Sequence, residues 1–276
     1  MRGPAVRARA LAVRYGIVTA LAPSSFEVAS GGVTAVIGPN GSGKSTLLNV
    51  IAGLVGPSEG EIEVDVDPGR LAYVMQATKV NENLPVTVRE VVAMGRYATV
   101  GVYGWTGAED RAAVDTAMER LGISALASRH LNDLSGGQRQ RVFVAQGLAQ
   151  DHDMLLLDEP MTGIDLTTAQ AIDEVIHGET EDGCTVMMTT HDLSEARLAD
   201  YVMLLSGRVV ACGTPEEVLT EEHLVVAYGP SLLHVEKGRV FLDDPAHSPA
   251  DGRHAHHERS IHTESDRSDL HGDQGS

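Results

Sequence analysis

The stretch "VTAVIGPNGSGKSTLLNVIAGL" (33–54) decides the fold class of this chain. It begins with a short apolar run (33–38), which is the pattern of a strand buried on both faces. "GPNGSGKST" (38–46) follows and fits the pattern G-x-x-x-x-G-K-[ST]. A glycine-rich turn between a buried strand and a helix predicts a phosphate-binding loop. The helix is expected to place four apolar residues on one face: Leu47, Leu48, Ile51 and Leu54.

The predicted loop acts mainly through its backbone. Its glycines allow the chain to wrap closely around an anion, so that successive N–H groups and the helix N-terminus point at the phosphates. Lys44 is expected to reach the β- and γ-phosphates of a nucleotide, and Ser45 to ligate Mg²⁺. A chance glycine turn is the alternative, and the neighbouring strand and helix argue against it. The nucleotide-binding residues expected here are Gly38, Pro39, Asn40, Gly41, Ser42, Gly43, Lys44, Ser45 and Thr46.

Two adjacent carboxylates follow a second apolar run, "DMLLLDE" (153–159). Asp158 is expected at the carboxyl end of a strand, which is where parallel sheets bind ligands. There it can hold Mg²⁺, directly or through water. Glu159 is the candidate to polarise an attacking water, since a well-placed base contributes roughly 10²–10⁴-fold to a rate. Paired acids after a strand are otherwise solvated or structural, but a phosphate loop elsewhere in the chain favours catalysis.

Strand-like and helical segments alternate up to about residue 242. "TVMMTTH" (185–191) is a third buried-strand candidate, and "YVMLLSGRVVACG" (201–213) predicts a hairpin that turns at Ser206–Gly207. Thr106 and Glu109 fit a capping box at the start of a helix that Gly122 ends. This alternation predicts an α/β core with a mainly parallel sheet. The apolar stripe of that helix is Val114, Ala117, Met118 and Leu121.

Bulk properties exclude some classes of protein. The chain has 276 residues and a formal net charge of -18, which argues against a general nucleic-acid binder. Its two cysteines indicate a reducing compartment and not a disulfide scaffold. No apolar run approaches the roughly 20 residues that span a bilayer, and the opening residues lack the apolar core of a signal peptide. We therefore expect a cytoplasmic protein that has no nucleic-acid partner.

The segment "LSGGQRQRVFVAQGLA" (134–149) strongly resembles the signature motif of ABC ATPases. It predicts a helix whose inner face carries Val142, Ala145 and Ala149. In that family the motif contacts the γ-phosphate of the ATP held by a second subunit, so that two nucleotides are sandwiched head to tail. The resemblance implies that this contact is made by Ser135, Gly136, Gly137 and Gln138.

Other family markers occur in the expected order over about residues 5–240. Tyr15 resembles the aromatic residue that stacks on adenine. Gln76 resembles the loop glutamine that touches Mg²⁺ and water. Asp165 resembles the loop that crosses the dimer, and His191 the switch histidine at the γ-phosphate. Taken singly, each has a plainer interpretation as a packing or surface residue, and Tyr15 depends most on the resemblance because the position of this aromatic varies.

The resemblance implies the domain organisation. Residues 1–242 are expected to form a P-loop ABC ATPase core with a mainly parallel sheet and an antiparallel β region. A helical signature subdomain is expected at about residues 77–150. Residues 243–276 are poor in apolar side chains, and we predict a disordered tail rich in His and Asp.

A single cassette resembles the detachable ATPase subunit of a transporter, which uses ATP and Mg²⁺. The expected partners are a second copy of the chain, an integral membrane permease and, indirectly, a substrate-binding protein; the location is the cytoplasmic face of the plasma membrane. "LPVTVREVVAMGRY" (84–97) and "EPMTGID" (159–165) look like cassettes that import zinc or manganese, although Met161 departs from their usual aromatic residue. The alternatives are a siderophore or haem importer and a soluble ABC ATPase without a transport role. Tyr103 and Trp105 are candidates for docking on the permease, or for local packing.

The tail has its own candidate site. Six of the chain's 12 histidines lie in residues 243–276, which also contain three arginines and eight acidic residues. Imidazole is a good zinc ligand, and His254, His256 and His257 can reach one ion without a preformed fold. This predicts zinc binding, as a buffer or as a brake on hydrolysis. The alternative is a solvated tail whose histidines are incidental.

Overall fold

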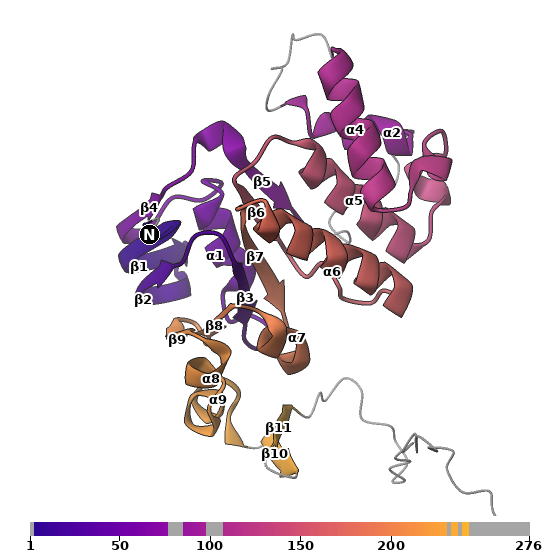
Figure 1. The fold of residues 1–276 in the computed structure, drawn as a ribbon. Coiled ribbons are helices and arrows are strands. Elements are labelled where there is room, and N and C mark those ends of the chain that lie inside the picture. Colours follow the sequence, from indigo (N-terminus) through magenta and orange to yellow (C-terminus); the bar gives the residue numbers. More distant parts are fainter. Residues whose placement is uncertain (1–2, 77–84, 98–106, 231–232, 237–238, 243–276) are drawn as a thin grey trace, which may run out of the picture. The chain divides into compact units, whose positions relative to one another are not determined.

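The computed structural model describes residues 3–76, 85–97, 107–230, 233–236 and 239–242 (Figure 1). The chain divides into two units, Met1–Asp243 and Asp244–Ser276, and the second lies outside the described residues. The predictions for Tyr103, Trp105, Thr106 and the tail histidines therefore also fall outside them. The strands are β1 (Val6–Tyr15), β2 (Val18–Val28), β3 (Val33–Ile37), β4 (Glu59–Val64), β5 (Leu71–Val74), β6 (Met154–Leu157), β7 (Thr185–Thr190), β8 (Tyr201–Leu205), β9 (Val209–Gly213), β10 (Leu233–Glu236) and β11 (Arg239–Leu242).

The helices alternate with these strands along the chain, as the sequence predicts. The α-helices are α1 (Lys44–Ile51), α2 (Val88–Met94), α4 (Ala108–Arg120), α5 (Gly136–Ala149), α6 (Leu166–Glu181), α7 (Leu193–Leu198), α8 (Pro215–Val218) and α9 (Glu221–Tyr228). Short 3₁₀ turns are η1 (Pro68–Arg70), η3 (Ser124–Leu126) and η4 (Leu131–Asp133). None of the helices in the described ranges is both long and apolar enough to span a bilayer.

The central sheet has the strand order β5-β6-β7-β3-β8-β9. Its neighbouring strands pair in parallel up to β8, and β9 pairs antiparallel with β8 through a hairpin that turns at Ser206–Gly207. A second, antiparallel sheet has the order β2-β1-β4, and β10 and β11 form a separate pair. These sheets confirm the predicted α/β class, with a mainly parallel sheet and an antiparallel region (Figure 1).

The central sheet is buried on both faces, because each face carries its own hydrophobic core. Alternate residues of a strand point to opposite sides. In β6, Leu155 and Leu157 therefore belong to the core with α4, α5 and α6. Met154 and Leu156 belong to the core with α1 and the antiparallel sheet. Burial on both sides explains why the strands β3 and β6 are almost wholly apolar in sequence. The strand β7 is buried along its whole length although three of its six residues are threonines.

The end of α1 differs from the prediction. Gly53 adopts φ +71° directly after the helix, and two backbone bonds close its last turn: Gly53 N–H to Val50 O (3.0 Å) and Leu54 N–H to Asn49 O (2.8 Å). This is a Schellman C-cap, for which glycine is the favoured residue. The helix therefore ends at Ile51, and Leu54 does not share its buried face but is 63% exposed.

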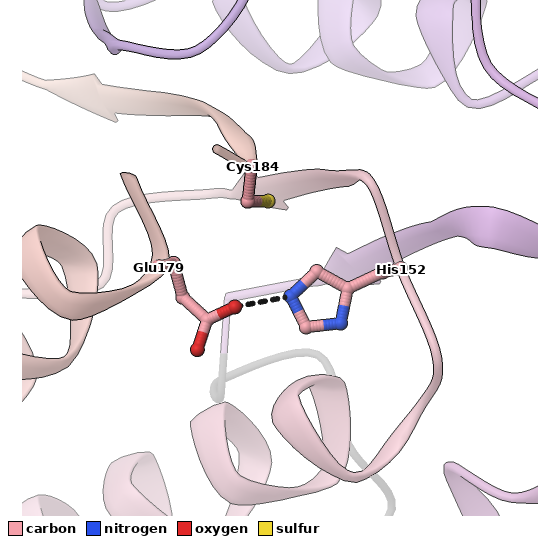
Figure 2. Close-up of side chains that lie close together, drawn as sticks. All are labelled: His152, Glu179 and Cys184. Atoms are coloured by element: carbon pink, nitrogen blue, oxygen red, sulfur yellow. Dashed lines mark ion pairs between the residues drawn. The ribbon is translucent and has the colours of Figure 1, made fainter. Parts of the chain in front are cut away.

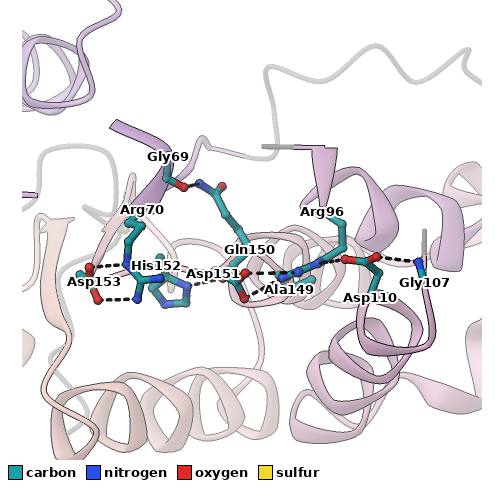
Figure 3. Close-up of polar contacts among 10 residues, drawn as sticks. All are labelled: Gly69, Arg70, Arg96, Gly107, Asp110, Ala149, Gln150, Asp151, His152 and Asp153. Carbon is teal, nitrogen blue, oxygen red and sulfur yellow. Dashed lines mark hydrogen bonds and ion pairs between the residues drawn. The ribbon is translucent and has the colours of Figure 1, made fainter. Parts of the chain in front are cut away.

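The start of α4 was also predicted one residue too early. Gly107 is the N-cap, and its backbone N–H donates to the carboxylate of Asp110 (2.7 Å). The N-cap is therefore Gly107 and not Thr106, which lies outside the described residues, and the carboxylate that caps the helix is that of Asp110 and not that of Glu109. The carboxylate of Asp110 also accepts a hydrogen bond from the guanidinium of Arg96 (2.8 Å), which lies just after α2 (Figure 3).

Arg96 joins the ends of three helices. Its guanidinium donates to Asp110, to the Ala149 carbonyl at the end of α5 (2.9 Å) and to Asp151 (2.8 Å) (Figure 3). Contact with Asp151 is the largest cause that raises the pKa of Arg96. Helices α2, α4 and α5 pack on one another beside this residue. They lie within residues 77–150, whose status as a subdomain stays a prediction.

Candidate active site

The phosphate loop connects β3 to α1, as the sequence predicts. Gly43 adopts φ +100°, and a Cβ there would lie 2.7 Å from the carbonyl oxygen of Ala20. A Cβ at Gly38 would overlap the Leu205 carbonyl. The loop thus requires glycine at both positions for local geometric reasons.

Lys44 holds a positive charge inside the loop. Its side chain is buried, and its Nζ donates to the carbonyl oxygens of Gly38 (2.7 Å) and Pro39 (3.4 Å). Burial lowers the pKa of Lys44, while the nearby carboxylates of Glu159 and Asp158 act to raise it. Of the remaining loop residues, Asn40, Gly41 and Ser42 lie between β3 and α1, and Ser45 and Thr46 lie in the first turn of α1.

Asp158 follows β6 and is 2% exposed. Its Oδ1 accepts hydrogen bonds from Ser45 Oγ of α1 (3.2 Å) and from Thr189 Oγ1 of β7 (2.8 Å). Residues from three elements thus meet at the carboxyl ends of the parallel strands. The grouping of Ser45 with Asp158 is the one expected from the sequence.

Glu159 has an uncommon backbone conformation for a residue with a side chain. Its φ is +51°, a left-handed value that a non-glycine residue adopts at some cost. Its backbone N–H donates to Thr189 Oγ1 (2.8 Å), and Gln76 Nε2 donates to its carboxylate (2.9 Å). The turn therefore aims the carboxylate toward the glutamine that follows β5. Strain of this kind is concentrated at functional sites.

Thr189 is the residue that the sequence analysis did not identify. Its hydroxyl donates to Asp158 and accepts from the Glu159 N–H, so it fixes both carboxylate residues. The available signal was the pair of threonines that ends the buried strand β7, just before His191.

A second group forms at the N-termini of α5 and α6. Ser135 caps α5 in a reciprocal capping box with Gln138 (3.3 and 3.1 Å). Asp165 caps α6 by accepting from the Thr168 N–H (3.0 Å), which with the Thr168 hydroxyl lowers the pKa of Asp165. A Cβ on Gly137 would lie 3.1 Å from both Asp165 Oδ2 and Thr168 Oγ1. The signature segment and the Asp165 loop are thus direct neighbours in one chain, and Ser135, Gly136 and Asp165 are exposed.

Two further candidates lie at strand ends. Tyr15 ends β1 and is 48% exposed, so its ring face can be reached. His191 follows β7 directly and is also exposed. The structure therefore gathers Ser45, Gln76, Asp158 and Glu159 into one site and the signature residues with Asp165 into another. The possible zinc ligands His254, His256 and His257 lie outside the described residues.

Comparison with known proteins identifies the family. The family profile described as ABC transporter matches residues 21–162. The chain is 40% identical over 234 residues to a protein of Yersinia pestis named chelated iron transport system membrane protein YfeB (82% of this chain, 79% of that protein). It is 39% identical over 231 residues to the zinc transport system ATP-binding protein TroB of Treponema pallidum (82% and 87%). It is 38% identical over 218 residues to the manganese transport system ATP-binding protein MntA of Synechocystis (76% and 84%).

Solved structures agree with this assignment. An inward-facing ABC transporter, described as of the metal-chelate type, matches with a TM-score of 0.74 and 27% identity over 87% of this chain and 96% of that one. A dimeric ATP-binding cassette in a post-hydrolysis state with ADP and phosphate matches with a TM-score of 0.67 and 27% identity over 76% and 98%. The site geometry and these similarities lead to one conclusion: the chain belongs to the ABC transporter family and is one of its ATPase subunits.

Proposed function

We propose that this chain hydrolyses ATP to drive import of a divalent transition metal, zinc or manganese. The observation that carries the ATPase assignment is the linked arrangement of Gln76, Glu159, Thr189, Asp158 and Ser45 at the carboxyl ends of the parallel strands. The names of the zinc and manganese relatives support the choice of cargo.

Each residue has a separate task in the proposed reaction. The loop N–H groups and Lys44 hold the phosphates, and Tyr15 stacks on the adenine. Glu159 accepts a proton from the attacking water, and Gln76 and His191 position the water and the γ-phosphate. In-line attack transfers the γ-phosphoryl group to water and leaves ADP and phosphate.

The residues near the loop fit a magnesium ion. Ser45 Oγ and Asp158 Oδ1 lie 3.2 Å apart, and both are hard oxygen donors of the kind that Mg²⁺ prefers. Ser45 and Asp158 would hold the ion, with Gln76 nearby. When bound, Mg²⁺ neutralises charge on the phosphate oxygens.

Full activity requires a second copy of the chain. Ser135, Gly136, Gly137 and Gln138 of one copy would contact the γ-phosphate held by Lys44 of the other, and Asp165 would cross the interface. The exposed N-termini of α5 and α6 support this arrangement, as does the dimeric state of a similar cassette.

The dimer would act on an integral membrane permease, with a substrate-binding protein as the indirect source of metal. This places the chain at the cytoplasmic face of the plasma membrane. The histidine-rich tail would bind zinc through His254, His256 and His257, on the strength of its composition.

The test combines hydrolysis with uptake. Glu159→Gln removes the proton acceptor and keeps the shape, so ATPase activity should fall by at least about 100-fold while ATP still binds. A cell in which the variant replaces the native gene should accumulate less zinc or manganese. Glu181→Gln, an exposed change at the end of α6, is the control and should leave both unchanged. Normal hydrolysis in Glu159→Gln would overturn the catalytic assignment; lost hydrolysis with normal metal content would overturn the cargo.

A further inference from the structure

Three potential metal ligands meet at the edge of the sheet opposite the ATP site. His152 lies two residues before β6, Cys184 lies one residue before β7, and Glu179 is in the last turns of α6. Since β6 and β7 are parallel neighbours, His152 and Cys184 share the amino-terminal edge, whereas Asp158 and Thr189 lie at the carboxyl ends. One nitrogen, one sulfur and one carboxylate oxygen lie within 4.8 Å of one another (Figure 2).

The three side chains are buried. Cys184 is 5% exposed, and the side chains of His152 and Glu179 are 5% and 9% exposed. His152 Nε2 lies 2.9 Å from Glu179 Oε2, yet it makes no hydrogen bond of acceptable geometry. The two groups form an ion pair when the ring is protonated (Figure 2). The nitrogen and the carboxylate oxygen that a cation would need therefore already face each other.

The surrounding groups orient the cluster as metal sites do. His152 Nδ1 lies 2.7 Å from the Gln150 carbonyl, which accepts a hydrogen bond from the Nδ1–H and leaves Nε2 to face the cluster (Figure 3). Gln150 is itself fixed by its side-chain amide, which donates to the carbonyls of Gly69 (3.2 Å) and Leu71 (2.8 Å). On the other side, Arg120 of α4 donates to the second oxygen of Glu179 (2.5 Å). Outer partners of this kind set the direction of the ligand atoms.

A cavity of about 690 Å³ gives access to the cluster. His152, Glu179 and Cys184 line it together with Asp65, Asp182 and the ion pair of Asp153 with Arg70, so acids outnumber bases in the lining. A cation would thus approach through an acidic surrounding, and water in the cavity can supply a fourth ligand.

We propose that Cys184 Sγ, His152 Nε2 and a Glu179 oxygen bind a thiophilic divalent cation of the zinc class. Thiolate, imidazole and carboxylate form a common zinc set, whereas hard cations such as Mn²⁺ avoid sulfur. Bonds of about 2.0 Å to N and O and about 2.3 Å to S place tetrahedral ligand atoms roughly 3.3–3.6 Å apart. The present cluster reaches this geometry by small movements that separate His152 from Glu179 and bring the sulfur closer.

Binding displaces protons and changes no oxidation state. The thiol of Cys184 loses its proton to solvent as the metal–sulfur bond forms. Burial acts to lower the pKa of His152, but its contacts with Cys184, Glu179 and the Gln150 carbonyl raise it to about 10. The Nε2 proton therefore also leaves when the cation enters. The site is independent of the ATP reaction and of the proposed cargo.

The test is a Co²⁺ titration of the full, reduced, chelator-treated chain without nucleotide. Cobalt bound to a thiolate gives a sulfur-to-metal charge-transfer band, which neither the tail nor the phosphate loop can produce, because Cys184 and Cys212 are the chain's two cysteines. We expect a band that saturates at one equivalent, disappears when one equivalent of Zn²⁺ is added and persists in excess Mn²⁺. Absence of the band in the unmodified chain would overturn the proposal.

Three variants and a matched control assign the ligands. Cys184→Ser should abolish the band, whereas Cys212→Ser, at the other cysteine, should retain it. Glu179→Gln should weaken Co²⁺ binding by more than the roughly 10–100-fold typical of losing an outer partner. If Cys184→Ser does not fold, loss of the band in His152→Gln serves the same purpose. A band that depends on Cys212, or one unchanged in Glu179→Gln and His152→Gln, would contradict this site.

Discussion

Thr189 Oγ1 is both a donor to Asp158 and an acceptor from the backbone N–H of Glu159. One uncharged side chain thus fixes the carboxylate expected at Mg²⁺ and the strained backbone that aims the proposed base. The position is buried in β7, so water cannot replace the hydroxyl without movement of the strand.

At the residue scale we therefore predict that Thr189→Val lowers kcat by about 10–100-fold. A hydrogen bond to a charged group contributes about 1.5–3 kcal/mol, and about 1.4 kcal/mol corresponds to a factor of ten in rate. ATP binding should change little, because the loop is untouched. Steady-state hydrolysis and equilibrium ATP titration separate the two effects.

Thr34→Val is the matched control. Thr34 is a buried threonine of β3 whose hydroxyl has no hydrogen-bond partner among the described residues, so valine there should be tolerated. If Thr189→Val hydrolyses ATP as fast as Thr34→Val, the hydroxyl does not organise the carboxylates.

Some site residues could be predicted from the sequence, and others could not. Gly38 and Lys44 lie in a motif of defined spacing, and Asp158 ends an apolar run, so all three could be proposed as site residues without coordinates. The bond from Gln76 to Glu159 joins residues 83 positions apart and exists only once β5 and β6 pair. Thr189 has no motif of its own, and a polar residue in a buried strand does not reveal which group it contacts.

At the scale of elements, Asp110 links the start of α4 to the ends of α2 and α5 through hydrogen bonds and ion pairs. Its carboxylate accepts from the Gly107 N–H at the start of α4 and from Arg96, which also contacts Asp151 after α5. The Gly107 bond, then the Arg96 contact, lower the pKa of Asp110 from 3.8. A carboxylate with a depressed folded-state pKa contributes stability above its unfolded value and loses it as pH falls through the folded one.

We predict that Asp110→Asn lowers the melting temperature at pH 7, and that its difference from the wild type shrinks as pH falls below about 3.8. The control is Asp115→Asn on the same helix. Asp115 pairs with Arg89 at an exposed position, and such pairs contribute little. Thermal unfolding at several pH values provides the measurement. A difference between Asp110→Asn and the wild type that stays constant down to pH 3 would contradict the assignment.

Elements were predicted where one physical signal dominates. β3 and β6 are almost wholly apolar because both of their faces are covered, so their sequences identify them directly. The ends of α1 and α4 were placed less well. Their caps depend on backbone bonds at Gly53 and Gly107, and glycine signals a turn without specifying on which residue the helix stops or starts.

At the scale of the whole molecule, the chain carries the two half-sites that we propose. The phosphate loop and its carboxylates form one, and the exposed N-termini of α5 and α6 form the other. Leu166, the first residue of α6, is 75% exposed beside Asp165. An exposed leucine next to two exposed helix caps is what a surface covered by a second copy would present. The sequence predicted both half-sites, but their relation across two copies came from the resemblance to the family.

Mixed dimers can show whether each ATP site is formed by residues of two copies. Ser135→Arg places bulk and charge where the partner's γ-phosphate would lie, and Lys44→Ala weakens nucleotide binding in its own chain. A mixed dimer with one change in each copy has one doubly altered site and one unaltered site, so it should retain ATP-dependent dimerisation. Homodimers of either variant should lose it, because both of their sites are damaged.

Light scattering with ATP, in a Glu159→Gln background that prevents turnover, measures dimerisation for all three combinations. Hydrolysis by the unmodified chain should also rise steeply with its concentration. Equal failure of the mixed dimer and the homodimers, or a specific activity independent of concentration, would contradict shared sites.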